Sequence, residues 1–113
     1  ELIRQAKKRG SRVTTEVTAQ HLYFTDDYLK GYEPVYKMAP PIRAEKDRQA
    51  LIEGVLDGTI DAIITDHAPH AHEEKDVPFC CAPNGIAGLE TSLSSVLTML
   101  YHTHRLSLTG LWN

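Results

Sequence analysis

The chain has 113 residues, of which 42% are hydrophobic and 24% charged, a balance typical of a soluble globular domain. Its formal net charge is −3 and basic residues are mixed with acidic ones, which argues against a nucleic-acid partner. No run approaches the roughly 18 apolar residues of a membrane helix and no signal-peptide pattern opens the chain, so we expect a cytoplasmic protein without a membrane partner. The two cysteines, Cys80 and Cys81, are sequence neighbours, which excludes a disulfide framework and fits buried or idle thiols in a reducing compartment.

The first predicted elements are a short helix and a strand. Leu2, Ile3 and Ala6 mark one face of a helix that ends before Gly10, a residue favoured after a helix C-terminus. Polar residues alternate with β-branched ones over residues 12–17, which predicts a β-strand.

A long connection and three further elements follow. Residues 18–43 read as one connection, and its length favours a functional role. A helix is predicted over residues 44–57, closed by Gly58. Residues 60–66 are almost continuously apolar, as in a parallel strand buried on both faces, and leucines at helical spacing predict a last helix over residues 89–100.

The order helix, strand, helix, strand, helix is the parallel α/β pattern, which fits a doubly wound sheet or a (β/α)8 barrel. Two strands complete neither fold, and a barrel takes about 250 residues. The sequence opens without methionine inside a helical pattern, and residues 106–108 start another helix. We therefore expect residues 1–113 to form one partial domain that is truncated at both ends.

The densest group of chemically active side chains is Thr65-Asp66-His67-Ala68-Pro69-His70-Ala71-His72, at the end of the buried strand. Active sites of α/β barrels lie at such strand ends. Asp66 with nearby imidazoles fits a divalent metal such as zinc. The alternative is a polar loop in which Asp66 caps backbone amides.

Two further positions carry weaker signals. Glu16, on the polar face at the end of the first strand, is either a metal ligand, an acceptor behind a ligand, or an exposed strand residue. Gly85 and Gly88 either let backbone amides approach a ligand or form turns.

The amino-acid sequence resembles the bacterial dihydroorotase family of the amidohydrolase superfamily. The runs VTTEVTAQHLYFTDD, KMAPPIR, DGTIDAIITDHAPH and APNGIAGLET follow the order and spacing of that family and cover nearly the whole chain. The resemblance implies the C-terminal portion of a (β/α)8 TIM-like barrel with a centre of two zinc ions. It also implies interconversion of N-carbamoyl-L-aspartate and L-dihydroorotate, a step of pyrimidine biosynthesis.

The resemblance assigns roles to individual residues. Asp66 matches the metal-ligating aspartate at the end of the last barrel strand, which is also the acid/base. His70 matches the histidine that contacts the substrate carboxylate, and Asn84 and Gly85 match the loop pair that touches the pyrimidine ring. Glu16 matches a glutamate that approaches the metal site in some members.

Several positions depart from the family pattern. Ala39 stands where the family usually has a substrate-binding asparagine, and Asn84 stands where a phenylalanine is usual. The usual PHH after EVT reads Ala19-Gln20-His21. The family's HxH pair from the first barrel strand, its bridging carboxylate or carboxylated lysine and two further histidines from middle strands have no counterpart in this sequence. We therefore expect the chain alone to be inactive.

Ala39 keeps two other interpretations open. The run KMAPPIR is also similar to allantoinases, which favours a cyclic amidohydrolase acting on allantoin or a hydantoin. The missing asparagine also fits a non-catalytic homologue that serves as a scaffold for aspartate transcarbamoylase. A small-molecule substrate is expected in either enzyme, and a homodimer or an association with aspartate transcarbamoylase is a possible assembly.

Overall fold

The computed structural model describes residues 1–112, which form an elongated α/β arrangement of 45 × 29 × 22 Å. The elements in chain order are α1 (Leu2–Lys8), β1 (Glu16–Thr18), α2 (Ala19–Tyr23), the 3-10 turns η1 (Asp26–Leu29) and η2 (Pro34–Tyr36), α3 (Glu45–Leu56), β2 (Ala62–Ile64), α4 (His72–Lys75), α5 (Ser92–Val96), the π-helical turn η3 (Leu97–Tyr101) and α6 (Leu108–Trp112). The predicted α/β class is confirmed.

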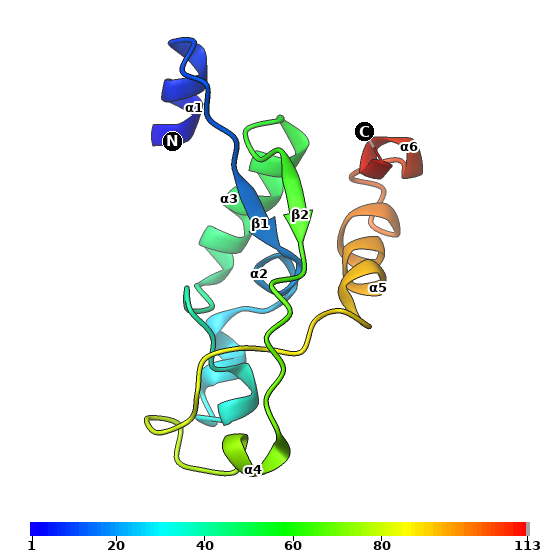
Figure 1. The fold of residues 1–113 in the computed structure, drawn as a ribbon. Helices are drawn as coiled ribbons and strands as arrows, with labels where there is room; N and C mark the ends of the chain where they lie inside the picture. The colour runs from blue at the N-terminus through cyan, green and yellow to red at the C-terminus, as the bar shows by residue number, and fades with distance from the viewer. Residues whose placement is uncertain (113) are drawn as a thin grey trace.

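The two strands pair in parallel at the centre of the molecule (Figure 1). In this register Glu16 lies opposite Ala62 and Thr18 lies opposite Ile64. The carboxyl ends of β1 and β2 therefore lie side by side, and the chain leaves both strands at the same edge of the sheet.

Both strands are shorter than their sequence patterns predict. The carbonyl of Thr15 accepts the amides of both Asp61 and Ala62, at 2.9 and 3.3 Å, while the Asp61 carboxylate accepts the Thr15 amide at 2.8 Å. Because a side chain replaces a backbone partner there, the regular ladder starts only at Glu16. The prediction that the second strand is buried on both faces is wrong for this chain, since Ala62 is exposed and the rest of β2 is half-buried.

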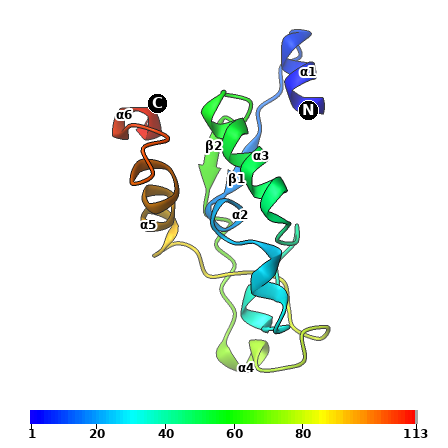
Figure 2. The same cartoon turned by 180° about the vertical axis from the view of Figure 1, so that it is seen from behind.

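The hydrophobic core lies where α2 packs between α3 and α5, as Figures 1 and 2 show from opposite sides. Leu22 of α2, Ile52 of α3 and Leu100 of η3 are all fully buried, and Val17 of β1 joins the same cluster. Thr18 starts α2 by accepting a hydrogen bond from the His21 amide, so the helix begins directly at the strand end. Residues 18–43 were predicted as one long connection, and the structure shows that they also contain α2, η1 and η2.

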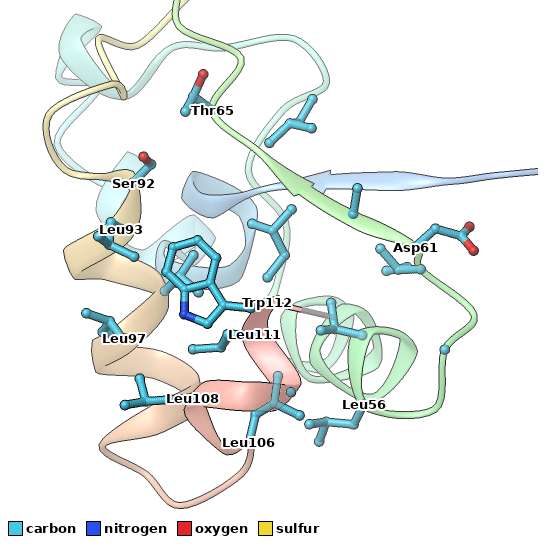
Figure 3. A pocket seen from close by; sticks show the side chains of 18 residues that line it. Leu56, Asp61, Thr65, Ser92, Leu93, Leu97, Leu106, Leu108, Leu111 and Trp112 are labelled. Carbon is cyan, nitrogen blue, oxygen red and sulfur yellow. The ribbon is translucent and has the colours of Figure 1, made fainter.

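An open apolar pocket of about 830 Å³ lies beside β2 and continues under α5 and α6 (Figure 3). Ile63 and Ile64 line it from the strand, and Leu97, Leu111 and Trp112 line it from the helices. This pocket explains why β2 is only half-buried, since its outer side faces the opening. Within residues 1–112 no helix is long and apolar enough to cross a membrane.

The predicted C-terminal helix starts at Ser92 and not at residue 89. It continues into η3, where the His102 amide donates to the Leu97 carbonyl five residues earlier, at 2.9 Å. Such a turn holds more residues than an α-helical turn. Leu106 and Leu111 then pack against the core cluster from beyond the turn.

The two cysteines are exposed, so of the two alternatives, buried or idle thiols, the buried one is wrong. Their Sγ atoms are 3.7 Å apart, and this contact raises the pKa of the Cys81 thiol. Both thiols are free.

Candidate functional site

Three loops meet beyond the carboxyl ends of the strands. They contain residues 37–41, 65–70 and 82–88. Ala68 donates its amide to the Ile86 carbonyl at 3.1 Å, and Gly85 donates its amide to the Lys37 carbonyl at 2.9 Å. The sequence segments that carry the predicted site residues are therefore brought to one end of the sheet.

Asp66 lies two residues beyond β2 and is exposed. Its backbone has a φ of +43°, in the left-handed region that costs most residues about 1–2 kcal/mol, although aspartate tolerates it better than most. Within residues 1–112 no hydrogen bond or ion pair engages its carboxylate. The alternative in which Asp66 caps backbone amides is therefore wrong, and its carboxylate remains available for other chemistry.

His70 is oriented by two groups of the chain. Its Nε2 donates to the Asn84 carbonyl at 3.0 Å, and its Nδ1 lies 3.5 Å from the Glu74 carboxylate. The structure therefore brings His70 and Asn84 into direct contact. For Nε2 to contact a bound anion, the ring must first release the Asn84 carbonyl.

Gly85 is required by close packing. Its φ is +138°, and a Cβ at this position would lie 2.7 Å from both the Cβ and the carbonyl oxygen of Ala68. A side chain would separate the loop of Asn84 from the loop that follows Asp66. The close approach is to another loop of the same chain, so the expectation that the Gly85 amide approaches a ligand stays a prediction.

Ala39 is exposed on the third loop, which His21 holds in place. The Nε2 of His21 donates to the Pro40 carbonyl at 3.0 Å, and its Nδ1 lies 2.7 Å from the Thr18 hydroxyl. His21 thus links the end of β1 to the loop of Ala39, which makes it a structural residue that orients a neighbour.

Two lysines that sequence reasoning missed join the loops. The Lys75 ammonium donates to the carbonyls of Pro34, Lys37 and Pro83 at 3.1, 3.3 and 2.9 Å. Burial, together with the nearby positive charge of Lys37, lowers the pKa of Lys75. The Lys37 ammonium in turn donates to the Ala82 carbonyl at 2.7 Å. The sequence carries no signal for this role of Lys75, because its three carbonyl partners lie 41, 38 and 8 residues away along the chain.

Glu16 lies away from this site. It is the first residue of β1 and pairs with Ala62, four residues before Asp66. Glu16 therefore lies at the amino end of the sheet, whereas Asp66 lies beyond the carboxyl end of β2. The expectation that Glu16 lies at the functional end of its strand is therefore wrong.

No protein-family model matches the chain. Curated dihydroorotases do match it along almost all of its length. The protein from Caldanaerobacter subterraneus is 50% identical over 113 residues, which are 100% of this chain and 26% of that protein. The one from Streptomyces coelicolor is 50% identical over 110 residues, 97% of this chain and 26% of that protein. The one from Staphylococcus epidermidis is 55% identical over 97 residues, 86% of this chain and 23% of that protein.

The chain belongs to the dihydroorotase family. It spans about a quarter of the length of these relatives. Solved structures share the fold of the chain. An L-hydantoinase (dihydropyrimidinase) from Arthrobacter aurescens superposes with a TM-score of 0.89 at 38% identity, covering 97% of this chain and 25% of its own. A dihydroorotase from Saccharomyces cerevisiae, solved with 5-fluoroorotic acid, shares the fold with a TM-score of 0.77 at 20% identity, covering 97% of this chain and 32% of its own.

Potential metal ligands are not grouped into a site within residues 1–112 of the chain. No group of three or more His, Cys, Asp or Glu side chains within residues 1–112 is placed to hold an ion. Asp66 offers a carboxylate without a partner. Of the neighbouring imidazoles, that of His67 accepts two backbone amides at Nδ1, and that of His70 lies between Asn84 and Glu74. One ligand does not satisfy zinc, which takes three or four from the protein.

Proposed function

We propose that this chain is part of a dihydroorotase, a cyclic-amide hydrolase that interconverts N-carbamoyl-L-aspartate and L-dihydroorotate. The observation that carries the proposal is 50% identity along the entire chain to proteins of that name. The parallel strands with an unpartnered Asp66 just beyond β2 support it, because active sites of (β/α)8 barrels lie at the carboxyl ends of strands. Neither the composition nor the helices conflict with a cytoplasmic enzyme.

The segment would supply the last strands of a (β/α)8 barrel. Its sheet holds two strands, and an apolar pocket opens beside β2. Coverage of about a quarter of each relative leaves enough additional chain to supply the other strands. In the complete protein, such a strand would lie along the open side of β2 and cover Ile63, Ile64 and Leu97.

We assign the role of general acid and base to Asp66. As a carboxylate it accepts the proton of the attacking water and returns it to the ring nitrogen when the amide C–N bond breaks. We also assign Asp66 as one metal ligand, with the remaining ligands supplied from outside residues 1–112. Zinc, when bound, polarises the carbonyl and lowers the pKa of its water.

The other loops would hold the ring. His70 contacts the substrate carboxylate, and Asn84 and Gly85 contact the ring through the loop that Gly85 lets approach Ala68. At position 39 an alanine cannot offer the hydrogen bonds of an amide. That difference, together with the TM-score of 0.89 to an L-hydantoinase, supports a second candidate, a hydantoinase-like or allantoinase-like enzyme.

The decisive experiment uses a complete-length protein in which residues 1–113 replace the corresponding quarter of the Caldanaerobacter dihydroorotase. Purified with zinc, it is assayed with dihydroorotate, hydantoin and allantoin, and the parent enzyme serves as control. Turnover of dihydroorotate above that of the other rings supports the first candidate. Preference for hydantoin or allantoin supports the second, and a folded, metal-loaded chimera inactive on all three supports the non-catalytic scaffold.

A further inference from the structure

We propose that His67 is a positioning residue that fixes the backbone of Asp66 through its Nδ1 atom. This inference rests on the proposed function, because it gives Asp66 a role in the reaction. It goes beyond that function by naming the side chain that holds the carboxylate in place.

The geometry around His67 is specific. Its Nδ1 lies 3.2 Å from the Gly88 amide and 3.1 Å from the Leu89 amide, and both amides donate to it. An imidazole nitrogen that accepts hydrogen bonds carries no proton, so in this arrangement the proton of the neutral ring is on Nε2. His67 therefore acts here as an acceptor, a role that a metal-ligating Nδ1 could not fill at the same time.

The residues on both sides of Asp66 are also fixed. The carbonyl of Thr65 accepts a hydrogen bond from Gln20 Nε2 at 2.8 Å, and Gln20 is only 5% exposed. Beyond His67, the Ala68 amide donates to the Ile86 carbonyl at 3.1 Å. Asp66 itself makes none of these bonds and sits between them.

We call the hydrogen bonds of Gln20 to Thr65 and of Gly88 and Leu89 to His67 the clamp, and its role is to hold the backbone of Asp66. Asp66 holds a left-handed φ of +43°, which aspartate adopts at a lower cost than most residues but which neighbouring contacts still have to favour over the common conformations. The bonds of Gln20 and His67 provide that restraint and leave the Asp66 carboxylate without partners. Gly88 is needed for the same reason, since a Cβ there would lie 2.9 Å from the Thr65 carbonyl.

The test compares two amide substitutions in the complete-length chimera. In His67→Asn the side-chain oxygen can take the place of Nδ1 and accept the two amides. In His67→Gln the side-chain oxygen reaches the place of Nε2 and cannot. We expect His67→Asn to keep kcat within about three-fold, and His67→Gln to lower kcat by about ten-fold or more with KM nearly unchanged, because only transition-state alignment is disturbed.

A second measurement does not depend on activity. In long-range ¹H–¹⁵N spectra of the histidine rings, His67 should show a bare Nδ1 and a protonated Nε2. In His67→Gln the Leu89 amide should exchange with solvent faster than in His67→Asn.

The outcomes separate the inference from the proposed function. Equal kcat for folded His67→Gln and the unchanged chimera, or a folded His67→Asn that loses kcat as fully as His67→Gln, overturns the inference. If His67→Gln changes the thermal midpoint without changing kcat, the inference is also overturned, because His67 then contributes to stability alone. If the unchanged chimera turns over no cyclic amide, the proposed function fails. A protonated Nδ1 of His67 in the ring spectra contradicts the clamp, whatever the activity.

Discussion

Asp66 combines a strained backbone with a carboxylate that nothing within residues 1–112 engages. Asparagine tolerates the same left-handed conformation, so Asp66→Asn keeps the backbone while removing the proton acceptor. In the complete-length protein we expect turnover to fall by about 10²–10⁴-fold or more, with little change in thermal midpoint. Steady-state kinetics, metal analysis and thermal unfolding of one preparation test this.

The control for that variant is Asp76→Asn, which changes an exposed aspartate at the end of α4. It should leave turnover unchanged. Retained turnover in Asp66→Asn with normal metal content would remove Asp66 from the mechanism.

Ala39 is the residue at which the choice of ring substrate is best tested. An asparagine there can offer the amide that the usual family sequence carries. Restoring a hydrogen bond to a polar ring group is worth about 1–3 kcal/mol, so Ala39→Asn should raise kcat/KM for dihydroorotate by about ten-fold or more. Parallel assays with hydantoin show whether the gain is specific. A lower kcat/KM for dihydroorotate would mean that the pocket is built for another ring.

At the scale of elements, charged side chains join α1 to the end of α3. Asp57, which follows α3, has its pKa lowered to about 2, first by hydrogen bonds from Thr59 and then by Arg4 of α1. Because the folded-state pKa lies below the ordinary 3.8, this contribution to stability is present above about pH 4 and is lost as the pH falls toward 2.

Asp57→Asn should therefore show a smaller drop in thermal midpoint between pH 5 and pH 2.5 than the unchanged chain. Arg4→Gln is the matched variant, and it should keep most of the drop because the Thr59 bonds remain. Identical drops in all three proteins would mean that Asp57 does not contribute to acid sensitivity.

Sequence patterns predicted the longer helices better than the strands. The apolar periodicity over residues 44–57 corresponds to α3, whereas the alternation over residues 12–17 overstates β1. The strand is shortened by the Asp61 carboxylate, a tertiary contact that alternation does not reveal. α2 was missed because five residues are too few for periodicity, although Thr18 was a readable N-cap.

At the scale of the whole molecule, the candidate site combines local and long-range features. The cluster around Asp66 was predictable because its members are consecutive and follow an apolar run. The bonds of His67 to Gly88 and of Lys75 to Pro34 join positions 21 and 41 residues apart, and a single sequence gives no signal for them. The roles of His70, Asn84 and Gly85 remain predictions, although the structure places these residues together.

Metal binding also depends on the whole molecule, because a site needs ligands from several segments. No group of three or more potential ligands within residues 1–112 is placed to hold an ion, so zinc binding by the 113-residue chain should be far weaker than the roughly 10–16 kcal/mol of structural zinc sites. Isothermal calorimetry with and without Asp66→Asn measures this, and chelators should leave the thermal midpoint unchanged. Tight stoichiometric binding would contradict the assignment of the other ligands to residues outside the chain.

The π-helical turn η3 gives the C-terminal region a tolerance for helix length. Its five-residue hydrogen-bond spacing accommodates one residue more than an α-helical turn would. Deleting the exposed Thr98 would let the turn close with α-helical spacing, and the residues beyond it would keep about the same orientation. Leu106 and Leu111 would then stay in the core cluster. A deletion within α5 would instead rotate everything beyond it by about 100° around the axis, so it should lower the thermal midpoint far more than the deletion of Thr98.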